Sequence, residues 1–291
     1  MILTLIHWIN AAWQAILTNV NWMSWNLFLA LIPLALGFWL FKPYGLSTIS
    51  IQRSGRVDLS VSPLLFWGVG FLMAVSVFPH FPRVLRFFWD MTQRLDWKYL
   101  IIVILITIAL MIREFWQSRI HHTQSPPRSL GWWMVFLLFI FFLPNAPYVL
   151  TDVIHLVEDI RKGYSIWIIS LALIPQYLVF MLLGFEAYIL SLIQLEGYCQ
   201  AQRWGIGYKG IELIVHFLCA IGIYLGRFQR FNSWDILTRP DVLVDSIIQE
   251  IFNQRPLLII SVTFVVLSLL YALLKPVTLA VLSSDYEPSQ M

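Results

Sequence analysis

The sequence has little charge and little cysteine. Charged residues make up 12% of the 291 residues, whereas soluble domains average roughly a quarter, and hydrophobic residues make up 59%. This composition excludes an ordinary soluble domain and predicts a polytopic membrane protein. The 19 basic and 16 acidic side chains leave a formal net charge of +3. So small a surplus does not indicate a nucleic-acid partner, so the basic residues are interpreted as headgroup anchors and membrane lipids are the expected partners.

The two cysteines indicate neither a disulfide nor a metal site. Cys199 falls in a predicted loop and Cys219 lies in the middle of a predicted span, a placement that does not favour a bridge. No spacing of cysteine and histidine is typical of metal ligands, so no metal and no cofactor are expected.

The N-terminal segment lacks the features of a removable leader. No lysine or arginine precedes its apolar part and no small-residue cleavage motif follows, so it is expected to stay in the mature chain. Apolar residues recur at helical spacing with Asn10, Gln14 and Asn19 between them. This pattern predicts an amphipathic interfacial helix over residues 1–21, with a first transmembrane span as the alternative.

Apolar runs near the length that a membrane-spanning helix needs, about 20 residues, indicate an all-α transmembrane bundle. About seven spans are predicted, within one domain over residues 22–275, and residues 276–291 are predicted to be a disordered polar tail. The fifth span is long for one crossing and contains Pro175 and Gly184. Lysine and arginine are divided almost equally between the two sides, so the orientation stays undetermined. The predicted spans are 22–41, 62–79, 98–115, 130–150, 165–195, 208–226 and 257–275.

The stretch FFLPNAPYVLTDVIHL, residues 141–156, places helix breakers at the end of an apolar run. Pro144 and Pro147 lack an N–H, which leaves the carbonyls of Ile140 and Leu143 without helical donors, and a break is predicted there. A freed carbonyl in hydrocarbon needs a partner, and Asn145 is the expected one. The alternative is a simple kink followed by a surface helix.

A short interfacial helix is predicted after the break, from Asp152 to Lys162, with Thr151 as its N-cap and Gly163 as its C-terminal stop. Asp152 and His155 are three residues apart and therefore share one face. They are the candidate catalytic residues, although a single DxxH motif lacks the third ligand that a metal site would need.

The stretch GIYLGRFQRFNSWD, residues 222–235, is the second polar segment. Gly222 and Gly226 form a GxxxG motif that favours close helix packing. Arg227 and Arg230 could clamp a phosphate or carboxylate, or they could be lipid anchors. A further short interfacial helix is expected after this span.

If the fifth span crosses once, the fourth and sixth spans run in the same direction and both polar segments emerge on one face. The sequence therefore predicts a composite ligand-binding site, with Asp152 close to Arg227 or Arg230. Its candidate residues are Asn145, Tyr148, Asp152, His155, Arg227, Arg230, Asn232 and Asp235.

Three segments resemble, in order, the conserved blocks of a known family. They are NLFLALIP at 26–33, FLPNAPYVLTDVIHL at 142–156 and GIYLGRFQRFNSWD at 222–235, and Phe231 stands where that family is expected to have tryptophan. The family is the bacterial membrane proteins of domain of unknown function 1361. The resemblance implies a multi-pass protein of the bacterial cytoplasmic membrane or another internal bacterial membrane, and it implies no activity.

Two ionisable residues fall inside predicted spans. Glu186 and His216 would lie at similar depth in antiparallel neighbours, so an intramembrane pair is expected. Such a pair could be purely structural or could serve transport.

Three hypotheses for the function follow. The first is a non-enzymatic membrane protein whose polar face binds a lipid headgroup or a partner subunit. The second is an enzyme that acts on a lipid or envelope substrate through Asp152 and His155. The third is a small-solute or proton-coupled transporter that uses Glu186 and His216.

Overall fold

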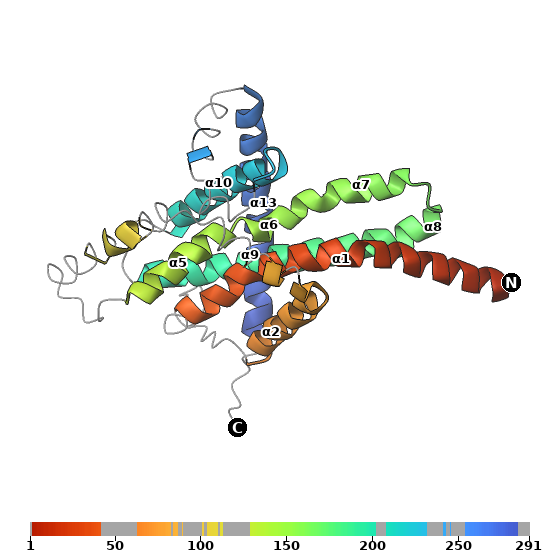
Figure 1. Cartoon of the computed structure of the whole chain (residues 1–291), viewed down its shortest axis with the longest axis horizontal. Coiled ribbons are helices and arrows are strands. Elements are labelled where there is room, and N and C mark those ends of the chain that lie inside the picture. The colour runs from red at the N-terminus through yellow and green to blue at the C-terminus, as the bar shows by residue number, and fades with distance from the viewer. Residues whose placement is uncertain are drawn as a thin grey trace.

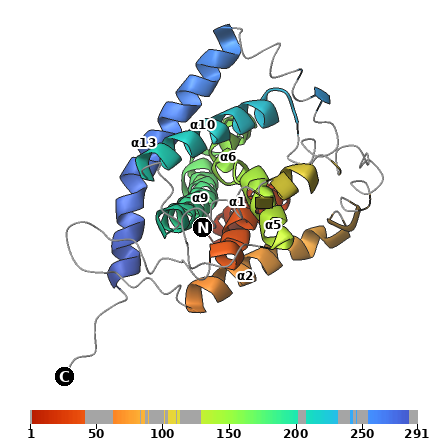
Figure 2. The same cartoon turned by 90° about the vertical axis from the view of Figure 1, so that its left-hand side faces the viewer.

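The computed structural model describes residues 2–41, 63–82, 129–201, 208–231 and 254–284, together with a few short stretches between them. Every regular element in these ranges is helical, and no strand occurs among them. The predicted all-α class is confirmed. In Figure 1, α1, the α5–α7 run and α9 lie alongside one another, whereas α13 crosses them steeply. Figure 2, viewed along the first group, shows α2, α10 and α13 around its outside.

Helix α1 runs without a break from Ile2 to Phe41. A separate interfacial helix over residues 1–21 is therefore not seen, because no glycine or proline separates it from the predicted first span. Ala12 and Ala15 are buried against Ile168 and Ala172, at the start of a later helix, so this half of α1 packs on the protein.

The NAPY segment bends the chain without ending the helical run. Helix α5 (Leu130–Phe142), α6 (Asn145–Tyr148), the 3-10 turn η3 (Val149–Asp152) and α7 (Val153–Arg161) follow one another directly. The side-chain amide of Asn145 donates to the carbonyl of Phe142 at 3.1 Å, next to the Leu143 carbonyl that Pro147 frees. The Leu143 carbonyl instead accepts the N–H of Ala146 at 3.2 Å. A local backbone donor thus replaces the helical bond that Pro147 removes at the Leu143 carbonyl.

The chain then reverses at Gly163, which has a φ of +80° as expected for a C-terminal stop. Helix α8 (Ile166–Ile168), the π-helical turn η4 (Ile169–Leu173) and α9 (Ile174–Ala201) form the long return run. The wider π turn lies just before Pro175, where a regular helix would bring the proline ring against the preceding turn. The π turn therefore lets this run continue through the proline.

Helix α2 (Pro63–Val77), followed by the 3-10 turn η2 (Phe78–His80), packs on α1. Helices α10 (Tyr208–Arg227) and α13 (Gln254–Ser284) pack on α9 and on each other. Helix α13 continues nine residues past 275, where a disordered tail is predicted; Leu279 and Leu282 pack against the main core. The rest of that tail, residues 285–291, lies outside the described residues.

The chain is a multi-pass membrane protein by the length and composition of its helices. Five runs in the described part are long and apolar enough to cross a membrane: Ile6–Phe41, Leu130–Arg161, Ile166–Gln200, Lys209–Arg227 and Arg255–Leu282. The predicted span 62–79 corresponds to a shorter apolar helix, Trp67–Val77. Half of the predicted span 98–115 lies outside the described residues, and the described half, which includes 104–109, is helical.

Candidate functional site

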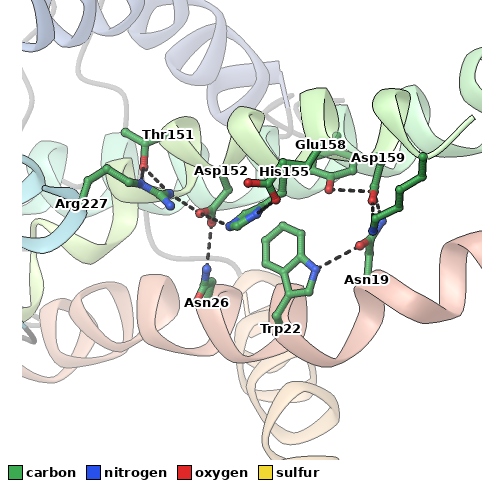
Figure 3. A network of polar contacts seen from close by, with 11 residues as sticks. Asn19, Trp22, Asn26, Thr151, Asp152, His155, Glu158, Asp159 and Arg227 are labelled. Atoms are coloured by element: carbon green, nitrogen blue, oxygen red, sulfur yellow. Dashed lines mark hydrogen bonds and ion pairs between the residues drawn. The ribbon is translucent and has the colours of Figure 1, made fainter. Parts of the chain in front are cut away.

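Two helices pair through matching polar residues at the centre of the candidate site. On α1, Asn19 and Asn26 are seven residues apart, and on α7 and its approach so are Asp152 and Asp159. Asn26 donates to Asp152 Oδ2 at 2.8 Å, and Asn19 donates to Asp159 Oδ2 at 2.7 Å. A seven-residue spacing returns side chains to nearly the same helix face. The two helices therefore meet in antiparallel register along a polar seam, shown in Figure 3.

The first end of this seam is a buried charge pair. The side chain of Asp152 is 1% exposed and accepts a hydrogen bond from the Arg227 guanidinium. The same guanidinium donates to Thr151 Oγ1 at 2.7 and 3.0 Å, and it lies 4.6 Å from the centre of the Tyr148 ring. The prediction that Asp152 lies close to Arg227 is confirmed. Because its donors are engaged here, Arg227 acts as a cross-link between α10 and η3.

Thr151 does not cap α7 as predicted. Its hydroxyl donates to the carbonyl of Tyr148 at 2.7 Å and accepts from Arg227, and no side-chain capping bond is formed at the start of α7. The reason is that helical turns precede Thr151, so the first N–H groups of α7 already have backbone partners.

The second end of the seam is organised around Asp159, which is buried. Besides Asn19, its carboxylate accepts from the Tyr177 hydroxyl at 3.1 Å and from the Lys162 ammonium at 2.7 Å. Lys162 lies in the turn after α7 and is half exposed. The hydrogen bond to Asp159 raises the pKa of the Lys162 ammonium above its usual value. This end thus joins α1, α7 and α9 through one carboxylate.

His155 lies between the two ends of the seam. Its ring packs against Trp22 with centroids 4.8 Å apart, and the Trp22 indole N–H donates to Asn19 at 3.1 Å. His155 Nδ1 lies 3.0 Å from Glu158 Oε2, and Nε2 lies 4.0 Å from Asp152 Oδ1. The side chains of His155 and Glu158 are 38% and 58% exposed, unlike those of the two aspartates. His155 and Glu158 therefore form an accessible rim, and this name is kept for the pair below.

The GxxxG motif positions Arg227 by close packing inside the chain. A Cβ on Gly222 would lie 2.8 Å from the Pro144 ring, and one on Gly226 would lie 3.1 Å from the Tyr148 ring. Since α10 and the NAPY segment approach this closely, the end of α10 brings Arg227 to Asp152. The two segments that the sequence analysis singled out thus contact each other directly.

The C-terminal residues of the predicted site do not all join it. Helix α10 ends at Arg227, and Arg230 follows in the left-handed conformation with a φ of +57°. Arg230 is therefore not on a helix face shared with Arg227, and it is exposed. Asn232 and Asp235, like most of the further interfacial helix expected there, lie outside the described residues.

The surface of α7 is apolar on the side that faces away from the protein. The side of α7 that faces the protein carries the buried carboxylates of Asp152 and Asp159. This is the reverse of an amphipathic helix in a soluble protein, which buries its apolar side. This arrangement suits an apolar surrounding such as lipid. The exposed apolar residues are Val153, Ile154, Val157 and Ile160.

The predicted pairing of Glu186 with His216 is not formed. His216 Nδ1 lies 2.6 Å from the Tyr188 hydroxyl, while the hydrogen-bond partner of Glu186 is Thr278 on α13. Equal depth in antiparallel helices brings two residues to one level but does not point them at each other. The transporter hypothesis loses the contact on which it was built.

Several site residues were missed by the sequence analysis, namely Asn19, Trp22, Glu158, Asp159, Lys162 and Tyr177. The spacing of polar residues in the sequence could have indicated Asn19, Trp22 and Asp159. Asn19, Trp22 and Asn26 have the spacing three then four, and so do Asp152, His155 and Asp159. Two segments with the same polar spacing can pair along one seam, whereas Tyr177 gives no such signal.

The site offers polar recognition, with acid–base chemistry limited to the rim. Among the described residues, no group of three or more histidine, cysteine, aspartate or glutamate side chains is placed to hold a metal ion. Cys199 and Cys219 are free and buried. Both ends of the seam are satisfied internally, so the rim is the part with capacity for a further partner.

Comparison with protein families gives one match. The family described as protein of unknown function, DUF1361, matches residues 97–269, which is more than half of the chain. This range contains the NAPY segment, α7, α9 and α10. No curated protein matches the chain, and no solved structure does.

Proposed function

The chain belongs to the DUF1361 family of proteins of unknown function, and we propose that it is a non-enzymatic membrane protein that binds the headgroup of an amine-bearing phospholipid. The ammonium would bind at the rim of His155 and Glu158. The resemblance noted from the sequence supports a bacterial cytoplasmic or other internal membrane as the location.

The observation that carries this proposal is the charge balance of the seam. Asp152 is paired with Arg227, and Asp159 is paired with Lys162. Among the described residues, no lysine or arginine lies within ion-pair distance of Glu158, and the hydrogen bond of its side chain there is to His155. The seam therefore has one accessible negative charge, the carboxylate of Glu158, that is not part of an ion pair with lysine or arginine, and this charge attracts a cation. A carboxylate and an ammonium form a charge-assisted hydrogen bond.

The surroundings of the rim support a lipid as the source of that ammonium. Exposed apolar side chains of α7 flank the rim, including Ile154 and Val157. Arg161 and Lys162 end this run one turn beyond Glu158, about 6 Å at 1.5 Å per residue. Basic side chains at a helix end are typical of the headgroup layer. A phosphatidylethanolamine headgroup would meet an apolar surface and a carboxylate together.

The test measures lipid retention by the purified full chain. Nanodiscs with equal amounts of phosphatidylethanolamine and phosphatidylglycerol are prepared, and the retained lipids are counted by native mass spectrometry. The intact chain should retain phosphatidylethanolamine preferentially. Glu158→Gln should reduce that preference about tenfold, as expected for one charge-assisted hydrogen bond.

Asp245→Asn is the matched control, since this exposed carboxylate has no described contact with the seam. Equal retention by the intact chain and Glu158→Gln would overturn the proposal. So would a preference for phosphatidylglycerol. Loss of a copurifying protein with unchanged lipids would assign the rim to a partner subunit instead.

An enzyme acting on a lipid is the second candidate, favoured by the imidazole of His155 between two carboxylates. Such flanking orients an imidazole for proton transfer. The lipid-binding protein and the enzyme differ in whether the bound lipid is chemically changed. An enzyme predicts that His155→Ala changes the lipid composition of expressing membranes, whereas a binding protein predicts unchanged composition with altered retention.

A further inference from the structure

The end of α7 carries two basic side chains that are engaged differently. Helix α7 ends at Arg161, and Lys162 follows it. The Lys162 ammonium donates to the carboxylate of Asp159 at 2.7 Å, so it belongs to the seam. Arg161 is exposed, and its guanidinium forms no ion pair with a described residue. Arg161 is therefore the basic group at this helix end that is accessible to a ligand.

His155 holds the Glu158 carboxylate away from Arg161. Arg161 is three residues after Glu158, a spacing at which opposite charges on one helix face commonly pair. These two side chains do not form an ion pair. Glu158 Oε2 lies instead 3.0 Å from His155 Nδ1, which is three residues away in the other direction. An exposed face of α7 thus carries a carboxylate and a guanidinium that are neighbours and are separated from each other.

The spacing of these two charges suits a small zwitterion. The Cβ atoms of residues three apart on a helix are about 5–6 Å from each other. Helix side chains lean toward the N-terminus, and the arginine stem is longer than that of glutamate, so the Arg161 guanidinium can reach the level of the Glu158 carboxylate. A phosphatidylethanolamine headgroup has two carbons between its amine and its phosphate oxygen. Its two charges are therefore separated by a distance of the same order.

We infer that Arg161 binds the phosphodiester of the lipid whose ammonium is bound by Glu158, so that the site recognises both charges of one headgroup. This inference rests on the proposed function. A planar guanidinium donates two parallel hydrogen bonds to phosphate oxygens. The carbonyl end of a helix disfavours an anion, but the last carbonyls of α7 already accept N–H groups from the turn that follows, which weakens this effect.

The test compares two ratios of lipids retained by the full chain in nanodiscs, counted by native mass spectrometry. Phosphatidylethanolamine and phosphatidylglycerol share the phosphodiester and differ in the ammonium, whereas phosphatidylethanolamine and oleylamine share the ammonium and differ in the phosphodiester. Arg161→Gln should lower the ratio of phosphatidylethanolamine to oleylamine about tenfold, as expected for the loss of a charge-assisted contact. It should leave the ratio of phosphatidylethanolamine to phosphatidylglycerol unchanged. Glu158→Gln should have the reverse effects.

Arg230→Gln is the matched control, because Arg230 is an exposed arginine outside the seam, and it should change neither ratio. An oleylamine ratio that Arg161→Gln leaves unchanged would overturn the inference, and the proposed function would stand if Glu158→Gln still lowered the phosphatidylglycerol ratio. An equal loss in Arg230→Gln would also overturn it, by assigning the effect to general surface charge. Glycerophosphoethanolamine carries the same two charges without acyl chains. Complete displacement of the lipid by an equal concentration of this compound would assign the site to a soluble phosphodiester.

Discussion

Asn19 on α1 donates a 2.7 Å hydrogen bond to Asp159 on α7, and seven residues further along α1 the contact repeats between Asn26 and Asp152. The repeat fixes which turn of α1 faces which turn of α7. Apolar side chains could slide past one another, but amide and carboxylate groups inside a largely apolar molecule lose their partners when the register shifts. The seam therefore specifies the alignment of two helices.

Replacing Asn19 should weaken one end of this seam. Asn19→Ala removes a bond to buried Asp159 and the acceptor of the Trp22 indole N–H. We expect the free energy of unfolding to fall by about 1–3 kcal/mol, as for a buried polar group that loses its partner. Thermal unfolding in detergent measures the change. Thr18→Ala, on the exposed side of the same turn, should have little effect. Equal effects of the two substitutions would contradict the prediction that the hydrogen bonds of Asn19 stabilise the packing of α1 on α7.

Breaking the buried charge pair should be more costly. Among the described residues, Arg227→Met leaves Asp152 with Asn26 as its one side-chain hydrogen-bond donor, and it uncouples α10 from η3. We expect a loss of about 3–5 kcal/mol, the usual cost of stranding one buried charge. Chemical unfolding of the purified chain measures this loss. Arg230→Met is the matched control, because Arg230 is exposed.

Removing both charges should restore part of that loss. The double variant Asp152→Asn with Arg227→Met leaves no unpaired charge, so it should be more stable than Arg227→Met alone. The comparison is a double-mutant cycle. If the two single effects simply add, then Asp152 and Arg227 do not interact and the charge pair is ruled out.

The sequence was sufficient to predict the pairing of the two polar segments. The composition predicts membrane-spanning helices. If the fifth span crosses the membrane once, the fourth and sixth spans run in the same direction, and Asp152 and Arg227 then lie on the same side of the membrane. The sequence did not predict that the helical run continues through residues that usually end a helix. Pro144 and Pro147 do not end the run, because Asn145 and Ala146 supply donors to nearby carbonyls. The helix propensity of single residues does not show which nearby groups will donate these hydrogen bonds.

The polar core around Lys275 could not be predicted for a different reason. Glu196, Glu212 and Lys275 lie on three helices, and their meeting depends on how α13 crosses α9 and α10. Crossing geometry follows from side-chain packing along whole helices, which span assignment does not provide. The same limitation explains the mistaken Glu186–His216 pair, since depth was known and rotation about the helix axis was not.

The close approach of α10 to the NAPY segment should tolerate no added methyl group. In Gly222→Ala the new Cβ would lie 2.8 Å from the Cβ of Pro144, whose ring is closed onto the backbone and cannot rotate away, so α10 must shift. We expect a loss of about 1–3 kcal/mol and a smaller one for Gly226→Ala, where the contact is 3.1 Å. Thermal unfolding measures both. Gly131→Ala is the control, since its nearest neighbour is 3.9 Å away. Unchanged stability in Gly222→Ala would show that the helices are further apart.

Chemical labelling should show that α7 faces lipid. Cys199 and Cys219 are buried, so single introduced cysteines report alone. Ile154 is exposed and apolar, and it lies eight residues before Lys162, about 12 Å at 1.5 Å per residue. In intact membranes Ile154→Cys should resist a membrane-impermeant maleimide, whereas Lys162→Cys, in the half-exposed turn, should react in membranes whose corresponding side is accessible. After detergent denaturation both should react fully, over and above the labelling of Cys199 and Cys219 measured in the unsubstituted denatured chain. Equal labelling of the two variants in sided membranes would place α7 in water, and its outward apolar face would then need a protein partner.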